Sequence, residues 1–255
     1  MRDRDRAVLG VLGVTAFVGL WWFATRHSAA SDVPGPRLTL LGLAEITRSG
    51  VLLRNVVASL FRVSFGFTLA VIMGVPLGLF VGWNARANAF LNPVIQALRP
   101  ISPIAWLPVA TLLMGSGDLA AVFLIWLSSF FPIVVSTAAA VRAIDTRYVR
   151  AAENFAIRGM PFVRRVLLPA ALPQIMTGLR VALGIAWVVV VAAEMLGVSS
   201  GLGYQVNDGR NNLRFDLVVA AMVVIGVIGY ALDSVLRALE RREVGRRSGS
   251  AARRV

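Results

Sequence analysis

Four long stretches of the 255-residue chain contain no charged residue. They cover 7–25, 63–85, 100–117 and 119–141. Each stretch is long enough to cross a hydrocarbon core of about 30 Å as a helix. Because backbone polar groups in lipid need partners within their own segment, a helix is the expected form of each stretch. The sequence therefore predicts an all-α, polytopic membrane protein.

The composition supports this prediction and argues against several kinds of functional site. Hydrophobic residues make up 57% of the chain and charged residues 15%, whereas a soluble domain carries about 25% charged residues. The chain has no Cys and one His, His27, so we expect neither a disulfide framework nor a metal site. All 26 basic residues are Arg, and a Walker-type phosphate loop needs a Lys. We therefore expect no enzyme and no cofactor bound by this chain, with any ATP hydrolysis on a separate polypeptide.

Six spans follow from these stretches and from the breaks between them. The first span is expected to be retained, because Trp21-Trp22-Phe23 stands where small residues would precede the cleavage site of a secretory signal. A charged connection at 142–170 separates the fourth span from the fifth. We expect a single transmembrane domain over 1–255, with spans at about 7–25, 57–83, 101–116, 119–141, 171–196 and 215–236.

The distribution of arginine predicts the orientation. With both termini in the cytoplasm, eighteen arginines fall on the cytoplasmic side and six outside, and Arg62 and Arg180 lie within spans. Arg99 is counted among the cytoplasmic ones. Because the cytoplasmic sides of membrane proteins collect Arg, the net charge of +13 indicates topology rather than binding to nucleic acid. We expect a multi-pass protein of the cytoplasmic membrane with both termini inside.

The connection at 145–169 has a helical pattern of its own. Four residues recur at helical spacing with charged residues between them: Tyr148, Ala151, Ala152 and Phe155. Gly159 and Pro161 are expected to end this short amphipathic helix, and a second short helix leads into Leu168-Pro169. Amphipathic helices of this kind dock into grooves on partner proteins.

This connection resembles the cytoplasmic loop of the permeases of binding-protein-dependent ABC importers. The loop of that family carries Glu-Ala-Ala, three residues, Gly, nine residues and then Ile-x-Leu-Pro. Here the chain reads Arg150-Ala151-Ala152, three residues, Ala156, nine residues and then Val166-x-Leu168-Pro169. The spacing agrees throughout, while Arg150 replaces Glu and Ala156 replaces Gly.

Other segments resemble the nitrate, sulfonate, taurine and bicarbonate branch of this family. They are Arg99-Pro-Ile-Ser-Pro-Ile-Ala-Trp106-Leu-Pro108, Leu179-Arg-Val-Ala-Leu-Gly184-Ile-Ala-Trp187, Ala192-Ala-Glu194-Met195-Leu and Gly201-Leu-Gly203-Tyr204. The resemblance implies a type I importer permease fold in a bacterial inner membrane. It also implies a second permease copy, cytoplasmic ATPase subunits that hold ATP and Mg, and an extracytoplasmic binding protein.

The resemblance implies import of a small anion such as a sulfonate, taurine or nitrate, with the ATPase contact in the connection. The residues assigned to that contact are Tyr148, Arg150, Ala151, Ala152, Phe155, Ala156, Arg158, Gly159, Leu168 and Pro169. The alternative is a secondary transporter driven by an ion gradient, which often shows inverted repeats and acidic residues near the midplane. A membrane-embedded enzyme would need a cluster of His, Asp or Glu, and the sequence offers one His with scattered acids.

The fifth span carries a polar stripe that is a candidate lining for a pathway. Its members follow one another three or four residues apart: Thr177, Arg180, Gly184, Trp187, Val191 and Glu194. Charges inside a span usually face a cavity or a partner. Arg180 either offers a favourable potential to an anion or is tied to carbonyls or lipid phosphate. Glu194 is expected to form an interfacial gate or an ion pair near the outer face.

Ser102 and Trp106 are further candidates for the pathway lining. They stand four residues apart in a segment interrupted by Pro103 and Pro108. Broken backbone in a membrane is tolerated where it lines a cavity or is buried in protein. The two residues therefore either line the pore or take part in ordinary helix packing.

Overall fold

The computed structural model describes residues 3–26 and 33–252, and this part of the chain is helical with no strand. The elements are α1 (Asp3–Thr25), α2 (Pro36–Arg48), α3 (Val51–Trp83), α4 (Ala85–Leu98), η1 (Pro103–Trp106), α5 (Leu107–Met114), α6 (Asp118–Arg142), α7 (Thr146–Asn154), α8 (Met160–Phe162), η2 (Val163–Leu167), α9 (Leu168–Gly197), α10 (Leu202–Asn211) and α11 (Phe215–Ala252). The all-α fold predicted from the sequence is confirmed.

Five of the described helices are long and apolar enough to cross a membrane. They are α1, α3, α6, the helix that continues from α8 through η2 into α9, and the first part of α11. A sixth candidate is the pair formed by α4 and η1–α5, which is bent by 86°. The polytopic architecture expected from the charge-free stretches is therefore confirmed, at five or six spans.

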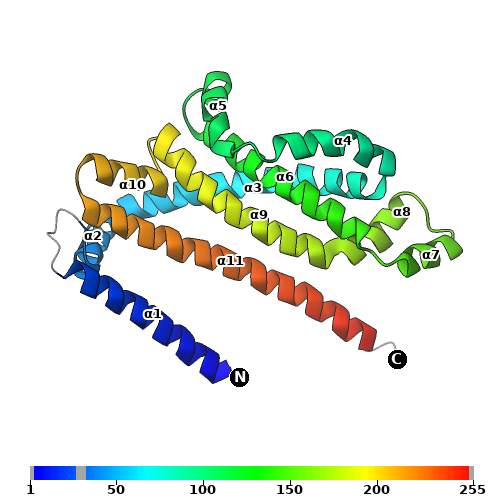
Figure 1. Ribbon diagram of the computed structural model, residues 1–255, viewed down its shortest axis with the longest axis horizontal. Helices are drawn as coiled ribbons and strands as arrows, with labels where there is room; N and C mark the ends of the chain where they lie inside the picture. Colours follow the sequence, from blue (N-terminus) through cyan, green and yellow to red (C-terminus); the bar gives the residue numbers. More distant parts are fainter. Residues whose placement is uncertain (1–2, 27–32, 253–255) are drawn as a thin grey trace.

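Helices α3, α6 and α9 form the centre of the bundle, with α6 packed against both of the others (Figure 1). Glycines on α3 let the α3 and α6 backbones approach closely. A Cβ built on Gly78 would lie 2.5 Å from Cβ of Thr137, and one on Gly82 would lie 2.7 Å from Cβ of Val141. The four-residue spacing of these glycines along α3 suits such close helix packing.

The bundle has two distinct ends, which we call the α7 end and the α10 end (Figure 1). At the α7 end, Trp83 at the close of α3 packs against Phe162 of α8, with ring centroids 4.7 Å apart and the ring planes tilted by 46°. At the α10 end, Arg214 joins α2 to α11, because its Nη2 lies 2.6 Å from Glu45 Oε2 and 2.9 Å from Asp216 Oδ2. Hydrogen bonds to Asp216 and Glu45 raise the pKa of the Arg214 guanidinium above its usual range.

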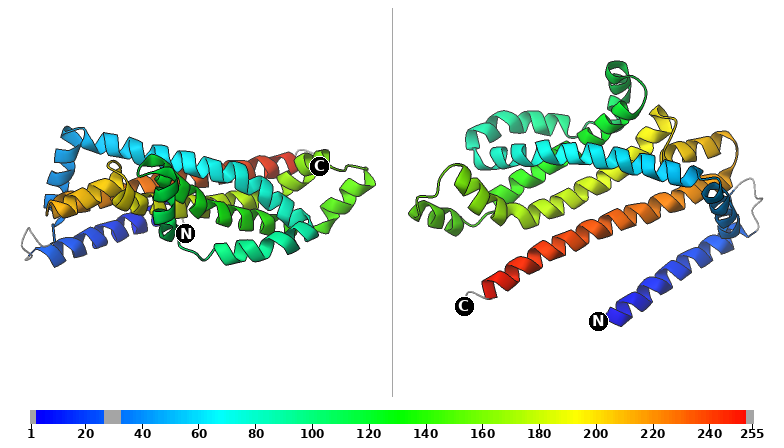
Figure 2. Two further views of the ribbon diagram at one scale, coloured as in Figure 1. Left: turned by 90° about the horizontal axis from the view of Figure 1, so that it is seen from above. Right: turned by 180° about the vertical axis from the view of Figure 1, so that it is seen from behind.

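Helix α11 runs along α9, whereas α1 stands apart from the bundle over most of its length (Figure 2). None of the apolar span of α1 is buried within this chain. Its Trp21 end approaches α11 near Met222, where the two helices border a shared hollow. An uncovered apolar helix is stable in a hydrocarbon environment, so the position of α1 agrees with a membrane protein.

The segment expected as a third span, 101–116, is not one helix. Pro100 and Pro103 flank the break after α4, and each lacks the N–H that a continuing helix would need. η1 and α5 cover only 103–114, so a crossing in this region would have to begin with α4 at Ala85. The sequence pattern located the apolar segment but not the bend within it.

Arg99 lies far from the loop between α3 and α4, although the arginine count had placed it on the cytoplasmic side together with Arg86. The 14 residues of α4 carry the chain about 21 Å from that loop before Arg99 is reached. Arg99 instead borders a cavity together with Ser128 and Pro132, which lie near the middle of α6. Without it, the arginine bias is seventeen to six and still favours the same orientation.

Candidate functional site

The predicted amphipathic helix in the charged connection is α7, which projects from one end of the bundle (Figure 1). Asp145 caps its start, accepting a hydrogen bond from the backbone N–H of Arg147 at 2.9 Å. Ala152 is buried against the core beside Phe162 and Ala171. Tyr148 and Phe155 are 61% and 80% exposed. Helix α7 therefore has one face anchored on the bundle and large apolar side chains left uncovered.

The end of α7 explains the Gly of the family pattern. The N–H of Ile157 donates to the carbonyl of Ala152 at 2.9 Å, and the N–H of Ala156 donates to Glu153 at 2.9 Å. This is the Schellman arrangement, in which the residue after the helix cap is left-handed and is usually Gly. Here that residue is Ala156, with φ of +53°. Ala156 thus adopts the left-handed conformation at a cost of about 1–2 kcal/mol of backbone strain.

The substitution Ala156→Gly is expected to stabilise the end of α7 by about 1 kcal/mol, because Gly adopts this φ without strain. Amide hydrogen exchange at Phe155 and Ile157 should slow by about fivefold, since 1.4 kcal/mol corresponds to a factor of ten. Ala151→Gly is the matched control. Ala151 lies inside the helix, so this change should speed exchange instead. Equal exchange rates in both variants would contradict the strain at Ala156.

Behind α7 lies a cavity of about 720 Å³ at the junction with α9. Five of the residues predicted for the ATPase contact border it: Tyr148, Ala151, Ala152, Phe155 and Pro169. Arg150 and Arg158 are exposed, and neither forms an ion pair among the described residues. Gly159 turns the chain with φ of +65°, and Leu168 packs on the core under α7. The fold brings the predicted contact residues together at one end of the bundle.

The chain enters α9 through the π-helical turn η2, 163–167. Pro169 has no N–H to give to the carbonyl of Arg165, so the regular ladder is interrupted there. Single π turns occur often at functional sites. Here the turn joins α7 and α8 to α9, so a displacement of α7 can be transmitted along the chain into α9.

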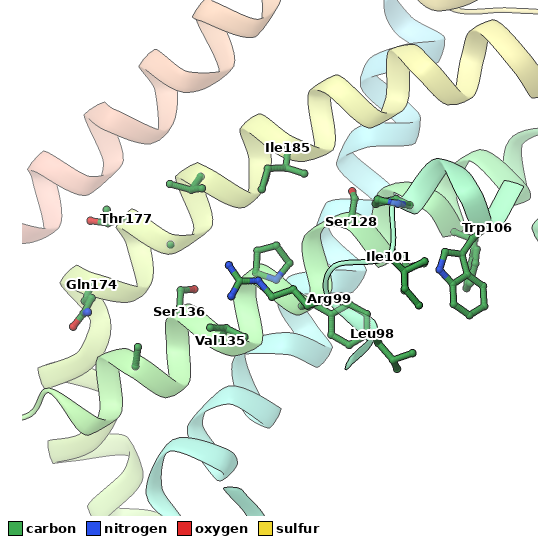
Figure 3. A pocket seen from close by; sticks show the side chains of 18 residues that line it. Leu98, Arg99, Ile101, Trp106, Ser128, Val135, Ser136, Gln174, Thr177 and Ile185 are labelled. Atoms are coloured by element: carbon green, nitrogen blue, oxygen red, sulfur yellow. The ribbon is translucent and has the colours of Figure 1, made fainter. Parts of the chain in front are cut away.

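A second cavity, of about 620 Å³, lies on the faces of α6 and α9 turned away from α3 and α11. Its lining comes from three places: the break between α4 and η1, the middle of α6, and the first half of α9 (Figure 3). The residues are Leu98, Arg99, Ile101, Pro103, Trp106, Phe123, Leu127, Ser128, Phe131, Pro132, Val135, Ser136, Ala139, Gln174, Thr177, Gly178, Val181 and Ile185.

The structure divides the six residues predicted to line a pathway into two groups. Trp106 and Thr177 border the 620 Å³ cavity. Ser102, Arg180, Trp187 and Glu194 do not. The indole N–H of Trp187 donates to the carbonyl of Ile225 on α11 at 3.1 Å, so this side chain is part of the α9–α11 contact.

Arg180 is neutralised by acidic residues of α11, which neither expectation for it included. Its Nε donates to Asp233 at 2.6 Å, and its Nη1 lies 3.6 Å from Glu240. Asp233 also pairs with Arg237 four residues later, at 2.7 Å. The sequence showed the Asp233–Arg237 spacing along one helix. It could not show that α11 packs along α9 and brings two carboxylates to Arg180.

Glu194 lies in a buried polar network at the α10 end and is fully enclosed. Its Oε1 accepts from Arg62 Nη1 at 2.6 Å, and its Oε2 accepts from the Ser59 hydroxyl at 2.8 Å and the Gly203 N–H at 3.0 Å. Arg62 also pairs with Asp118 at 2.7 Å. Of the two readings given for Glu194, the structure contains the ion pair.

The network continues along α3 and fixes the start of α10. Asn55 Oδ1 accepts from the N–H of Gly201 at 3.1 Å, and its Nδ2 donates to Gln205 at 2.8 Å. Ser59 accepts from the N–H of Leu202 at 2.9 Å. Asn55, Ser59 and Arg62 follow one another at intervals of four and three, so they share one face of α3.

Sequence reasoning missed Arg99, Gln174 and the serines of α6 as cavity residues. A signal was present on α9, because Gln174, Gly178, Val181 and Ile185 are also spaced four, three and four apart. This face adjoins the predicted polar stripe, but it carries no charge and was passed over. Among the described residues no group of three His, Asp or Glu could hold a metal, and His27 lies outside them.

Comparison with known proteins agrees with this geometry. The family model for the inner membrane component of binding-protein-dependent transport systems matches residues 74–244. The taurine transport system permease protein TauC of Escherichia coli is 34% identical, over 92% of this chain and 87% of that protein. The bicarbonate transport system permease protein CmpB of Synechococcus elongatus is 34% identical, over 93% of this chain and 89% of that protein.

A solved structure shares the fold. A chain of the inward-facing MetNI methionine ABC transporter superposes with a TM-score of 0.62 at 20% sequence identity, over 74% of this chain and 95% of that chain. The family match covers both α7 and the 620 Å³ cavity, and the relatives extend over almost the whole sequence. The chain therefore belongs to the family of inner membrane components of binding-protein-dependent transport systems, as the permease of an ABC importer and not its ATPase.

Proposed function

We propose that this chain forms the translocation pathway of an ATP-driven importer for a small anion such as a sulfonate, taurine or nitrate. The observation that carries the proposal is α7, an exposed amphipathic helix that stands at one end of the bundle with the family spacing. Family membership implies an ATPase and a binding protein as partners. Relatives that are named for taurine and bicarbonate support an anionic substrate.

We propose two identical copies in the transporter, with the α7 end and both termini in the cytoplasm. The arginine bias supports this orientation. Two cytoplasmic ATPase subunits, which hold ATP and Mg, would receive the α7 helices. The binding protein would deliver its substrate at the α10 end. Because Arg150 and Arg158 are exposed near the uncovered Tyr148 and Phe155, the receiving cleft is expected to be apolar with acidic residues around it.

In the proposed cycle, ATP closes the pair of ATPase subunits and draws the two α7 helices together. The movement passes through η2 into α9, and the pathway opens toward the outside. Hydrolysis resets the transporter. This chain contributes the docking helix, the connection into α9 and the wall of the pathway, while the phosphoryl chemistry stays on the ATPase.

The alternative is a carrier driven by an ion gradient. Such carriers use acidic residues near the midplane that bind and release a proton or cation. Here Glu194 is enclosed with Arg62, and Asp233 lies between Arg180 and Arg237. The 620 Å³ cavity has no acidic residue among the described residues that border it. These contacts favour the importer.

Growth of a deletion strain tests the proposal. Taurine or an alkanesulfonate is supplied as sole sulfur source, and nitrate is supplied as sole nitrogen source in a parallel culture. We expect a growth defect on one of these sources that this gene restores, with normal growth on sulfate and ammonium as the control. Normal growth of the deletion strain on all of them would contradict import of these anions.

A further inference from the structure

The 620 Å³ cavity contains a single charged group among the described residues that border it, the guanidinium of Arg99. Arg99 directly follows α4, at the break before η1. In Figure 3 it lies between Trp106 at one end of the cavity and Gln174 at the other. The neighbouring Ser128 and Pro132 belong to the middle of α6, so Arg99 lies beside the middle of the bundle rather than at one of its ends, with its side chain exposed on this open face.

Arg99 differs from Arg62 and Arg180, the two arginines expected within spans, because it has no counterion among the described residues. Among the described residues it forms no ion pair and no side-chain hydrogen bond, whereas Arg62 and Arg180 both pair with carboxylates. A charge at the depth of a membrane span is costly unless it is paired or faces a water-filled cavity. The N–H donors of the Arg99 guanidinium are therefore available to a ligand in this cavity.

The donors available in the cavity suit an anion. A guanidinium presents five N–H groups and binds carboxylate, sulfonate or phosphate oxygens in pairs. The hydroxyls of Ser128 and Ser136 already donate to carbonyls of their own helix, at 2.8 and 3.1 Å. Gln174 makes no side-chain hydrogen bond among the described residues, so its amide adds two donors. The donors left for a bound molecule are thus Arg99, Gln174 and the indole N–H of Trp106, which makes no hydrogen bond among the described residues.

The rest of the lining is apolar, which narrows the class of anion. Aromatic and branched side chains form most of the wall, among them Trp106, Phe123, Phe131, Val181 and Ile185. A volume of about 620 Å³ lies in the range of small-molecule sites, about 300–1,000 Å³. An inorganic anion such as nitrate has no apolar part to place against these side chains. An organic anion can bind Arg99 through its charged group and place its apolar part against these side chains.

We propose that this cavity is a binding site within the permease for an organic anion, in which Arg99 binds the sulfonate or carboxylate group and the wall around Trp106 receives a compact apolar body. The inference rests on the proposed function, since it locates in this chain a site for the transported anion. It assigns to Arg99 the role first considered for Arg180, which is already neutralised.

The test uses the purified permease–ATPase complex in phosphatidylcholine nanodiscs, with benzenesulfonate as the probe and isothermal titration as the measurement. We expect Arg99→Gln to weaken benzenesulfonate binding at least about tenfold, because a hydrogen-bonded charge is lost. Arg99→Lys keeps the charge but loses the paired N–H contacts, so its affinity for benzenesulfonate should lie between those of the wild type and Arg99→Gln. Arg86→Gln is the matched control, since it removes an exposed arginine at the other end of α4 and should change nothing.

The neutral analogue benzenesulfonamide gives a second readout that needs no variant. It should bind the wild type at least about tenfold more weakly than benzenesulfonate does. If Arg99→Gln does not fold, the comparison of the two probes still tests whether the cavity requires an anionic ligand. No binding of benzenesulfonate up to about 1 mM, equal binding to Arg99→Gln, or equal binding of the two probes would overturn the proposal. Loss of binding in phosphatidylglycerol-containing discs would also overturn it, because a lipid headgroup would then be the ligand of Arg99.

The two proposals fail in different ways. If the deletion strain has its growth defect but benzenesulfonate binding does not depend on Arg99, the cavity site is wrong and the importer remains. If the deletion strain grows normally on every source but benzenesulfonate binding depends on Arg99, import of these anions is wrong and the site remains.

Discussion

Replacing Arg62 by Leu is expected to lower the free energy of unfolding by about 3–5 kcal/mol. The guanidinium is 2% exposed and its partner Glu194 is fully enclosed. Without Arg62, the Glu194 carboxylate keeps only the Ser59 hydroxyl and the Gly203 N–H, and no counterion. A buried charge that loses its partner is strongly destabilising, whereas its pairing adds little beyond an apolar core of the same shape.

Thermal unfolding of the detergent-solubilised chain measures this effect, and we expect Tm to fall by about 10 °C. The double variant Arg62→Leu with Glu194→Leu should recover a large part of the loss, because both charges are removed together. Arg54→Leu is the control on the same helix, since Arg54 is exposed and makes no ion pair among the described residues. A loss equal to that of Arg54→Leu would show that the network contributes nothing specific.

The membrane-spanning helices of this fold could be predicted from the sequence because the hydrophobicity of their residues determines them. In lipid, a charge-free stretch such as 119–141 is stable only as a helix, and α6 covers this stretch. The helical form of α7 was likewise predicted, since its apolar residues recur at helical spacing, while the cap formed by Asp145 came from the structure. These features depend on neighbours in the sequence, which is why they needed no knowledge of tertiary packing.

The polar contacts inside the bundle could not be predicted in the same way. Arg180 and Arg62 were both visible as charges within spans, but their carboxylate partners lie 53 and 132 residues away. Which helices are neighbours is decided by packing, for example by the glycine face of α3 against α6. The cavity face of α9 was also hidden, because its residues are mostly apolar and charge was used to choose the pathway side.

The bend between α4 and η1 is a further feature that could be predicted only in part from the sequence. Prolines at 100 and 103 indicate that a helix is interrupted, but they do not give the direction in which the chain continues. The arginine count therefore placed Arg99 on the cytoplasmic side, whereas α4 places it beside the middle of α6. Its importance follows from two facts that only the structure supplies, the cavity and the absence of a carboxylate beside it among the described residues.

Ala151→Glu is expected to abolish ATP-driven import. Ala151 is exposed on α7 and borders the 720 Å³ cavity with Tyr148 and Phe155. Glu has nearly the helix propensity of Ala, so α7 itself should persist. If this surface enters a cleft of the ATPase, an unpaired carboxylate must be buried there, at a cost of about 2–5 kcal/mol. We therefore expect the uptake rate to fall at least about tenfold.

Asn88→Glu is the matched control for this variant. Asn88 lies on α4 at the same end of the bundle, and its side-chain oxygen accepts a hydrogen bond from Arg142 at 2.9 Å. Glu at this position adds the same charge and keeps a favourable partner. Import should continue in this variant, and both variants should be present in the membrane at the level of the wild type.

Uptake of the sulfur or nitrogen source identified by growth, compared between cells that carry Ala151→Glu and cells that carry Asn88→Glu, decides whether this chain works through an ATPase docked on α7. Loss of uptake in the first variant and retention in the second, at equal amounts of inserted protein, is the predicted result. Unchanged uptake in Ala151→Glu would contradict the docking role of α7 and would favour a carrier that needs no ATPase.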